Sequence, residues 1–290
     1  MTRSGFGIGP TLPYRVKAAV TLARSAAWAA RAGGQPECRG LRILLYHRVA
    51  DDGDPLAIPP RRFREQMDHL AAEGYRAVDL LAGLERLERG ASSERTIALT
   101  FDDGFTDVAE QALPALERHG FRATVFVATG VTDGRVAFPW YEGPQPPVLG
   151  WEDVVALDRE GTLRFEAHTV THPSLLALDD AAAAAEIAGS RGELAERLGR
   201  PVSAFAYPAG LYGERERRLV ADAGYTVAVS CEPGVNLPGS DPFALRRRQI
   251  DSRDRLLDFK AKLGGGHDTP LPLRATYRRL RYRMPESSRA

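Results

Sequence analysis

The sequence predicts an α/β fold built from parallel strands, and two patterns carry this prediction. Short apolar runs rich in β-forming residues recur along the chain, and segments with helical character lie between most of them. Alternation on this scale is typical of βα units, in which consecutive strands lie parallel. With 290 residues and 43% hydrophobic composition, the chain can bury one substantial core. We therefore expect one main domain.

The expected elements follow in order along the chain. Strands are expected at residues 41–46, 76–80, 96–101, 123–128, 163–167, 202–207, 225–230 and 245–250. Helices are expected at residues 62–72, 107–119, 151–159, 180–198, 214–223 and 253–263. In the helix expected at residues 180–198, Asp179 and Asp180 precede the alanine run at 181–185 and are typical capping residues. Residues 14–32 carry Lys17, Arg24 and Arg31 at heptad spacing, which is compatible with an amphipathic helix.

Two adjacent carboxylates, Asp102 and Asp103, follow the expected strand at 96–101. In α/β folds, ligands and catalytic side chains collect at the C-terminal edge of the strands, and Gly104 lets the backbone turn sharply there. An aspartate at such a junction also commonly caps the next helix. A second motif shifts the balance towards a chemical role.

The second motif places His168 and His172 after the expected strand at 163–167. Because Pro173 follows at once, we expect a loop at a strand end rather than a helix face. Neutral imidazole is the commonest protein ligand for zinc and similar metals, and an aspartate is a natural third ligand. Asp103, His168 and His172 are therefore the predicted metal ligands, with one coordination position left for water.

These residues give the chain a resemblance to the polysaccharide deacetylases, also called carbohydrate esterase family four. The matching segments fall within residues 41–250 and are Thr100-Phe101-Asp102-Asp103-Gly104, His168-Thr169-Val170-Thr171-His172 and Ala206-Tyr207-Pro208-Ala209-Gly210. The resemblance implies that Asp102 is the general base and that the second aspartate and both histidines bind the metal. It also implies a distorted, incompletely closed (β/α) barrel of about seven to eight parallel strands.

The chain departs from the family pattern at two points. The third motif usually carries an arginine two positions before its proline, where it orients the base, and this sequence has Ala206 there. We expect either another residue to orient Asp102 or a looser orientation. The late histidine that supplies the general acid in many members has no good match after Tyr225. His47, at the end of the first expected strand, is similar to the N-terminal Tyr-His motif of a permuted subgroup and is the general-acid candidate, although a histidine there can also be only a satisfied polar group.

Further candidate residues surround this core set. In the third motif, the backbone N–H near Ala209, after Pro208, is a candidate oxyanion donor, and Tyr207 is a candidate substrate contact. Residues 134–150 are rich in proline and glycine and predict a long loop, in which Trp140 and Tyr141 either stack on sugar rings or pin the loop to the core.

The resemblance implies a metal-dependent hydrolase that acts on carbon–nitrogen bonds other than peptide bonds. Its expected reaction removes N-acetyl groups from amino sugars in a polysaccharide, an oligosaccharide or a lipid-linked glycan precursor. The expected cofactor is a divalent metal, zinc first, with cobalt, nickel or iron as alternatives. A catalytically impaired glycan-binding relative, an O-acetyl esterase and a deformylase stay open. The sequence holds no nucleic-acid-binding motif, so we expect an acetylated glycan and no nucleic acid as partner.

Charge divides the chain into a basic extension at 1–40, a catalytic domain at 41–265 and a basic tail at 266–290. The net charge is +1; residues 1–36 and 274–290 each carry +5, and subtracting both from +1 leaves −9 for the rest. Basic ends suit a membrane surface or a lipid-linked substrate, and solvated tails explain them more simply.

Location and oxidation state are less constrained. Arg24 interrupts the apolar part of segment 14–32, so it is a poor export signal, and no run is long enough to span a bilayer. Cys38 and Cys231 are too few for a disulfide framework, and unpaired thiols are the simpler expectation. These features favour a cytoplasmic or peripheral membrane protein, with an extracytoplasmic location as the alternative.

Overall fold

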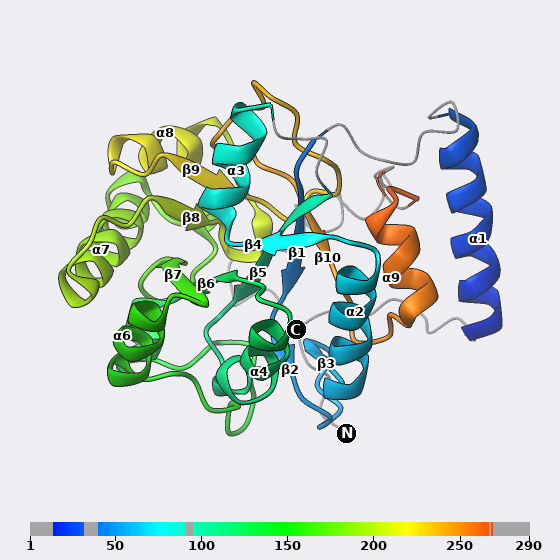
Figure 1. Ribbon diagram of the computed structural model, residues 1–290. Helices are drawn as coiled ribbons and strands as arrows, with labels where there is room; N and C mark the ends of the chain where they lie inside the picture. The colour runs from blue at the N-terminus through cyan, green and yellow to red at the C-terminus, as the bar shows by residue number, and fades with distance from the viewer. Residues whose placement is uncertain (1–13, 32–39, 91–94, 267, 269–290) are drawn as a thin grey trace.

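The centre of the protein is a parallel sheet whose strands curl into a nearly closed barrel with one unsealed seam (Figure 1). This computed structural model describes residues 14–31, 40–90, 95–266 and 268. The strands lie in the order β10, β1, β5, β6, β7, β8, β9, and β4 pairs with the first half of β5. Every pairing of this sheet within the described residues is parallel. At the seam, an isolated bridge joins Val229 to Leu245.

All the expected strands are confirmed, with shorter bounds at several of them. They are β1 Arg42–Tyr46, β4 Arg76–Val78, β5 Thr96–Asp102, β6 Ala123–Val127, β7 Leu163–Ala167, β8 Ala204–Ala206, β9 Val227–Val229 and β10 Arg247–Gln249. A separate two-stranded sheet pairs β2 Arg48–Val49 with β3 Ala57–Ile58. The predicted distorted, incompletely closed (β/α) barrel is therefore correct.

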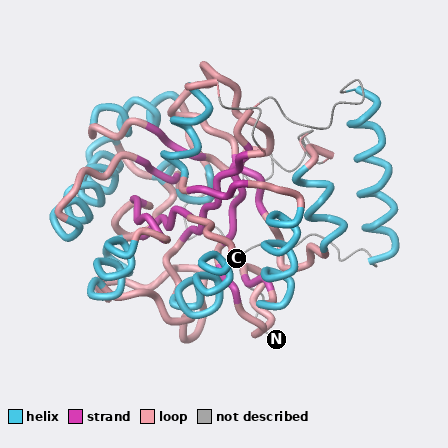
Figure 2. Tube along the Cα trace, in the orientation of Figure 1, coloured by secondary structure: helices cyan, strands magenta, loops and turns pink. Residues whose placement is uncertain are grey.

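Helices surround this barrel on the outside, as Figure 2 shows. They are α1 Tyr14–Arg31, α2 Pro60–Ala72, α3 Leu80–Glu88, α4 Leu113–Arg118, α5 Thr129–Thr132, α6 Trp151–Glu160, α7 Asp180–Leu198, α8 Glu214–Asp222 and α9 Leu256–Leu263. Single turns η3 Leu175–Ala177 and η4 Pro208–Gly210 lie between them. The expected helix at 107–119 begins as a π-helical turn, η2 Val108–Ala112, and only then continues as α4.

Helix α3 was not expected from the sequence, and its position explains why the strand before it is short. The side chain of Asp79 accepts a hydrogen bond from the backbone N–H of Ala82 at 3.0 Å, so the chain turns into a helix directly after Val78. Leu80 and Leu87 of this helix share an apolar cluster with Leu41 at the N-terminal end of the barrel. Helix α3 thus closes the end of the barrel opposite the predicted site.

The side chains of β5 alternate between two environments, and this alternation positions the site. Ile97, Leu99 and Phe101 belong to the cluster that packs against the outer helices. Ala98 belongs to the inner cluster, and Thr100 binds Arg247 inside the barrel. Asp102 continues this inward row at the C-terminal end of the strand.

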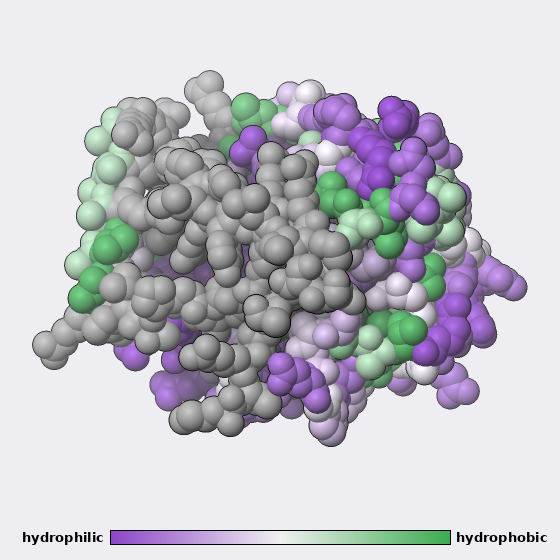
Figure 3. All heavy atoms as spheres, turned by 180° about the vertical axis from the view of Figure 1, so that it is seen from behind, coloured by the Kyte–Doolittle hydropathy of each residue, from purple (hydrophilic) through white to green (hydrophobic). Residues whose placement is uncertain are grey.

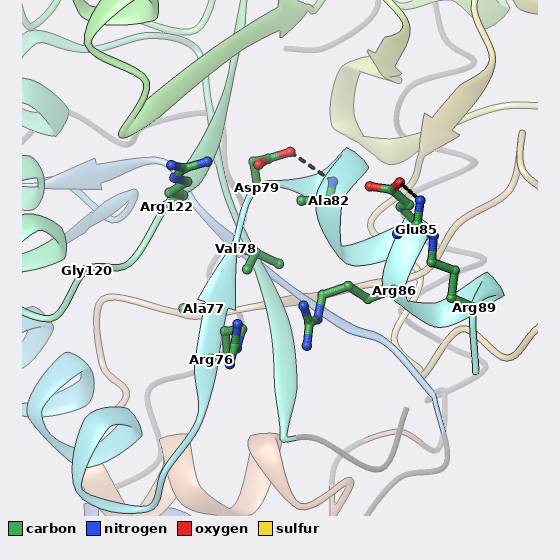
Figure 4. Close-up of a pocket in the computed structure, with 10 residues that line it drawn as sticks. All are labelled: Arg76, Ala77, Val78, Asp79, Ala82, Glu85, Arg86, Arg89, Gly120 and Arg122. Carbon is green, nitrogen blue, oxygen red and sulfur yellow. Dashed lines mark hydrogen bonds and ion pairs between the residues drawn. The ribbon is translucent and has the colours of Figure 1, made fainter. Parts of the chain in front are cut away.

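A cavity of about 460 Å³ lies at the other end of the barrel, next to α3 and before β6 (Figure 4). Figure 4 shows that its walls carry arginines, of which Arg89 is paired with Glu85 at 2.6 Å. None of the predicted site residues lines it. Its lining residues are Arg76, Ala77, Val78, Asp79, Ala82, Glu85, Arg86, Arg89, Gly120 and Arg122.

The described chain after α9 is tied back to the barrel. Asp268 accepts two hydrogen bonds from Arg42 of β1, each at 2.9 Å, and one from Arg248 at 2.8 Å. The predicted boundaries at 40 and 265 stay predictions. Arg3, Cys38 and the six arginines of residues 274–290 lie outside the described residues. Among the helices described, none has the length and hydropathy needed to cross a bilayer.

Candidate active site

Asp102 and Arg247 form a buried, two-pronged ion pair at the C-terminal edge of the barrel. Arg247 is fully buried and donates from Nη1 to Oδ1 of Asp102 at 2.6 Å and from Nη2 to Oδ2 at 2.7 Å. Its Nε donates to the backbone oxygen of Ser230 at 2.9 Å, and the guanidinium lies 5.5 Å from the centre of the Phe126 ring. This fork fixes both carboxylate oxygens, because a guanidinium matches a carboxylate in plane and spacing.

The ion pair also sets the charge of Asp102. Burial by itself would raise the pKa of this carboxyl, but the charge and hydrogen bonds of Arg247, together with His168 and His47, outweigh burial. The pKa of Asp102 is lowered to about 2 as a result. Asp102 is therefore an ionised acceptor across the whole neutral range.

Asp103 occupies an unusual backbone and electrostatic position. Its φ is +75°, in the left-handed region that residues with a side chain rarely adopt. The carboxylate is buried, and within the described chain its Oδ1 accepts no hydrogen bond. Burial raises the pKa of Asp103 well above its usual range, and the charge of Asp102 raises it further. A buried carboxylate oxygen left in this state requires a cation or a proton.

The two imidazoles of the histidine motif converge on that carboxylate. The Nε2 atoms of His168 and His172 both lie 3.7 Å from Oδ1 of Asp103 and 3.0 Å from each other. Nδ1 of His168 bonds to the backbone oxygen of Ala206 at 2.7 Å, which places the proton on Nδ1 and leaves Nε2 as an acceptor. Burial lowers the pKa of both imidazoles, which favours their neutral form.

The loop that carries the histidines is held by α7. Glu186 accepts hydrogen bonds from the backbone N–H of Val170 at 2.9 Å and of Thr171 at 2.8 Å, and from the Thr171 hydroxyl at 2.6 Å. Thr169 accepts the N–H of His172 at 3.0 Å on its Oγ1. The backbone is left-handed at Thr169, φ +68°, and at His172, φ +58°. These bonds keep a strained loop in one conformation.

The three converging side chains fit a divalent metal. Ligand atoms at about 2.1 Å from a tetrahedral zinc ion lie about 3.4 Å apart, which matches the separations of Asp103, His168 and His172. The bond from His168 to Ala206 is the outer support that metal-bound imidazoles need. The Asp103 carboxylate oxygen has no hydrogen-bond donor, and burial favours the neutral form of the two neighbouring imidazoles. A cation would satisfy all three groups, whereas they do not satisfy one another. Among the histidine, cysteine, aspartate and glutamate side chains of the described residues, only these three have ligand atoms close enough together to share a metal ion.

His47 lies near Asp102. Tyr46 of β1 pairs with Phe101 of β5, and His47 and Asp102 are the residues that directly follow this pair. The charge of Asp102 acts on the His47 imidazole, which places the two side chains near each other. The imidazole is half-buried. Burial lowers its pKa to about 4, against an opposing effect from the charge of Asp102 and with further lowering by Arg247 and His168. His47 therefore belongs to the same electrostatic unit as the metal set.

The third motif contributes backbone atoms more than side chains. The side chain of Tyr207 faces the helices, where its ring stacks on Tyr212 at 4.8 Å and its hydroxyl donates to Phe243 O at 3.0 Å. Pro208 is buried, and Ala209 is half-buried in the turn η4 with φ +54°. A substrate contact by the Tyr207 side chain is not supported by this orientation, whereas the backbone donor at Ala209 stays a prediction.

The aromatic loop borders the metal set. The ring of Trp140 lies 4.7 Å from that of His172, edge to face, and stacks on Phe138 at 4.5 Å. Phe138 is almost fully buried, and the Tyr141 hydroxyl donates to Asp54 at 2.7 Å. Burial and this bond raise the pKa of Tyr141. These contacts pin the loop to the core, and stacking of Trp140 or Tyr141 on a sugar ring stays a prediction.

Two residues with clear roles at the site were missed from the sequence. Arg247 orients Asp102 in place of the side chain absent at Ala206, and Glu186 anchors the histidine loop. The run Arg246-Arg247-Arg248 in an expected buried strand was the available signal, because a strand cannot bury an arginine without an anionic partner. For Glu186, on a helix of alternating small residues, the sequence offers no comparable signal.

The barrel is nearly closed and carries at its C-terminal edge an Asp-His-His set that could hold a metal ion, with a second aspartate bound by an arginine beside it. Residues 89–228 match the family model described as polysaccharide deacetylase. Over this segment the chain is therefore similar to the polysaccharide deacetylases, and its deacetylase relatives indicate a hydrolase acting on carbon–nitrogen bonds other than peptide bonds.

Particular relatives extend this result. The chain is 28% identical over 211 residues to the putative polysaccharide deacetylase YxkH of Bacillus subtilis, covering 72% of this chain and 71% of the relative. It is 21% identical over 199 residues to the poly-beta-1,6-N-acetyl-D-glucosamine N-deacetylase of Staphylococcus aureus, covering 66% and 67%.

Solved structures share the fold. The Streptococcus pyogenes deacetylase PplD, in complex with acetate, superposes with a TM-score of 0.67 at 24% identity and covers 77% of this chain and 98% of its own. IcaB from Ammonifex degensii superposes with a TM-score of 0.65 at 23% identity, covering 79% and 97%.

Proposed function

We propose that this protein is a metal-dependent deacetylase that removes N-acetyl groups from amino sugars in a polysaccharide, an oligosaccharide or a lipid-linked glycan precursor. The convergence of Asp103, His168 and His172, with Asp102 at 4.0 Å from Nε2 of His168, is the observation that carries the proposal. The N-deacetylase from Staphylococcus aureus supports an acetylated amino sugar as the substrate class.

The proposed metal is zinc, held by one carboxylate oxygen and two imidazole nitrogens. When bound, such a cation polarises a carbonyl oxygen and lowers the pKa of a neighbouring water towards ~7. Burial raises the pKa of Asp103, and the positive charge of a bound cation would offset this effect and favour the ionised carboxylate. Cobalt, nickel and iron suit the same ligand types.

Asp102 takes the proton of the attacking water in this proposal. Its pKa of about 2 keeps it ionised, and Arg247 directs both of its oxygens. A carboxylate with so low a pKa is a weak base, so the acidity of the water has to come from the cation. Arg247 accordingly orients Asp102 and keeps it ionised, but does not make it a stronger base.

His47 gives a proton to the departing nitrogen. Because its pKa is about 4, the imidazole is neutral at pH 7 and has to take up a proton during the cycle before it donates one. Asp102, whose charge acts on this imidazole, is the group that has just accepted a proton. The amine therefore leaves protonated, and both side chains return to their initial states.

The impaired glycan-binding alternative loses one of its two supports. It rested on the residue missing at Ala206 and on the absent late histidine, and Arg247 now orients the base. His47 beside Asp102 speaks against the second support. O-acetyl esters and formyl amides need the same residues and are separated from N-acetyl amides by a substrate panel.

The test is acetate release from N-acetylhexosamine oligomers. We expect activity that a chelator abolishes and added zinc restores, with kcat lowered about 10²- to 10⁴-fold in Asp102→Asn. His168→Ala should lose bound zinc as well as activity. His119→Ala is the matched control, because this histidine pairs with Asp68 on an outer helix at 2.8 Å. Zinc binding without hydrolysis of any acetylated sugar would refute the proposal.

A further inference from the structure

Helix α1 packs on the protein with its hydroxyl groups inward. Thr21 is 1% exposed and its Oγ1 donates to Oδ1 of Asp258 on α9 at 2.9 Å. Ser25, one turn later on the same side, lies so close to Gly266 that a Cβ there would come within 2.6 Å of its Oγ. These contacts fix which side of α1 faces the domain. An ordinary surface helix buries its apolar side instead.

The opposite side of α1 is apolar and faces outward. Among the residues of this helix whose side chains the structure describes, the exposed ones are all alanine, valine or leucine: Val16, Ala19, Val20, Leu22, Ala23, Ala26, Ala27 and Ala30. Val16, Val20 and Leu22 are 44%, 46% and 55% exposed, and the rest of the described chain adds only Val136 and Leu237 to the exposed large hydrophobic residues. In Figure 3 this stripe forms the pale and deep green left edge of the molecule. Such a continuous apolar face marks a contact surface.

The net positive charge of α1 indicates which kind of partner binds its outward face. Its sequence contains Arg15, Lys17, Arg24 and Arg31 and no acidic residue. A second copy packed helix to helix would bring two helices of the same net positive charge together, which opposes a dimer through this face. An anionic lipid surface accepts both features, because apolar side chains enter the headgroup boundary and basic ones bind lipid phosphates.

We propose that the outward face of α1 docks the protein on an anionic lipid bilayer, with the helix lying in the plane of the membrane surface. The helix does not meet the requirements for crossing a bilayer, so it lies on the surface. The Thr21–Asp258 bond and the close approach at Gly266 couple α1 to α9, so docking holds the barrel and not only a tethered helix. This inference stands independently of the reaction proposed above.

Cosedimentation of the full chain with lipid vesicles tests the proposal. We expect binding to vesicles of phosphatidylcholine mixed with phosphatidylglycerol, weakened by added salt, and little binding to phosphatidylcholine alone. The triple variant Lys17→Gln, Arg24→Gln, Arg31→Gln should lose about 100-fold in affinity, since each basic residue near an anionic surface contributes about a factor of five.

A second variant separates the apolar contribution from charge. Val20→Gln with Leu22→Gln leaves the net charge unchanged and should lower vesicle affinity about tenfold. Leu237→Gln is the matched control, because Leu237 is 49% exposed and lies outside α1. Since Val20, Leu22 and Leu237 are exposed, circular dichroism and Tm should be unchanged in these two variants, as should hydrolysis of a soluble oligosaccharide.

Three results would overturn the proposal. The first is wild-type protein that stays in the supernatant with anionic vesicles. The second is a double variant at Val20 and Leu22 that binds as tightly as Leu237→Gln. The third is a dimer in vesicle-free buffer, seen by light scattering, that the same double variant dissociates, since a second copy would then cover the face.

Discussion

Replacing Arg247 tests whether this arginine sets the pKa and the orientation of Asp102. In Arg247→Met, Asp102 loses both of its charge-assisted bonds, of 2.6 and 2.7 Å, but stays buried. Without the opposing charge of Arg247, burial would raise the pKa of Asp102 above its ordinary value. We expect the acidic limb of the kcat/KM profile against pH to move to higher pH, and the rate at pH 7 to fall.

The stability change can be worked from the same pair. Lowering the Asp102 pKa from 3.8 to about 2 corresponds to about 2 kcal/mol of folding free energy. Because the folded pKa is the lower one, this stabilisation is complete above the unfolded pKa and is lost as the pH falls towards 2. Leaving a charge buried without its partner typically costs about 3–5 kcal/mol at neutral pH. Arg247→Met should therefore unfold at lower denaturant concentration at pH 7, with a smaller difference in acid.

Three further variants make the result decisive. Arg247→Lys keeps a charge but not the fork, and should fall between wild type and Arg247→Met in both activity and stability. Arg247→Met combined with Asp102→Asn removes both charges, and should recover stability without recovering activity. Arg246→Gln is the control, because Arg246 is exposed on the adjacent position. An acidic limb that stays in place in a folded Arg247→Met protein would refute this account.

Three other predictions concern the rest of the site. His47→Ala should lower kcat about 10²- to 10⁴-fold while zinc content, measured by elemental analysis, stays at the wild-type level; a parallel loss of zinc would contradict its role as an acid. Glu186→Ala removes the three bonds that hold residues 170 and 171, so zinc affinity should drop about 10- to 100-fold in a competition assay, and unchanged affinity would count against its anchoring role. Asp103→Asn should raise Tm at pH 7 in chelator, because a buried carboxylate with a raised pKa destabilises the fold above its unfolded pKa, and should lower Tm in added zinc; the same sign in both conditions would argue against a cation at Asp103.

The fold was predictable because its signal is local. Each expected strand corresponds to a described strand, since buried parallel strands read as short apolar runs bounded by turns. Helix α3 was missed because residues 76–80 and the apolar start of the helix form one continuous run, and only the capping bond of Asp79 separates them. The π-helical turn at Val108–Ala112 likewise leaves no local pattern in the sequence.

The site was predictable only where its residues form motifs. Asp102, Asp103, His168 and His172 lie at strand ends, where the fold gathers side chains, so their types and positions were sufficient. Arg247 is 145 residues from Asp102 along the chain. Its role depends on β10 lying next to β1, which in turn lies next to β5. A pairing that depends on strand order cannot be read from local sequence.

Backbone strain is concentrated in the motifs of the candidate site. The residues other than glycine with positive φ in the described chain are Asp103, Thr169, His172 and Ala209, and all four belong to the aspartate, histidine or third motif. Each such residue costs of order 1–3 kcal/mol, so the surrounding structure must hold these turns in place. Glu186 does so for the histidine loop. If the strain exists to aim ligands at a cation, Asp103→Gly should relieve it, raise Tm in chelator and still abolish zinc binding.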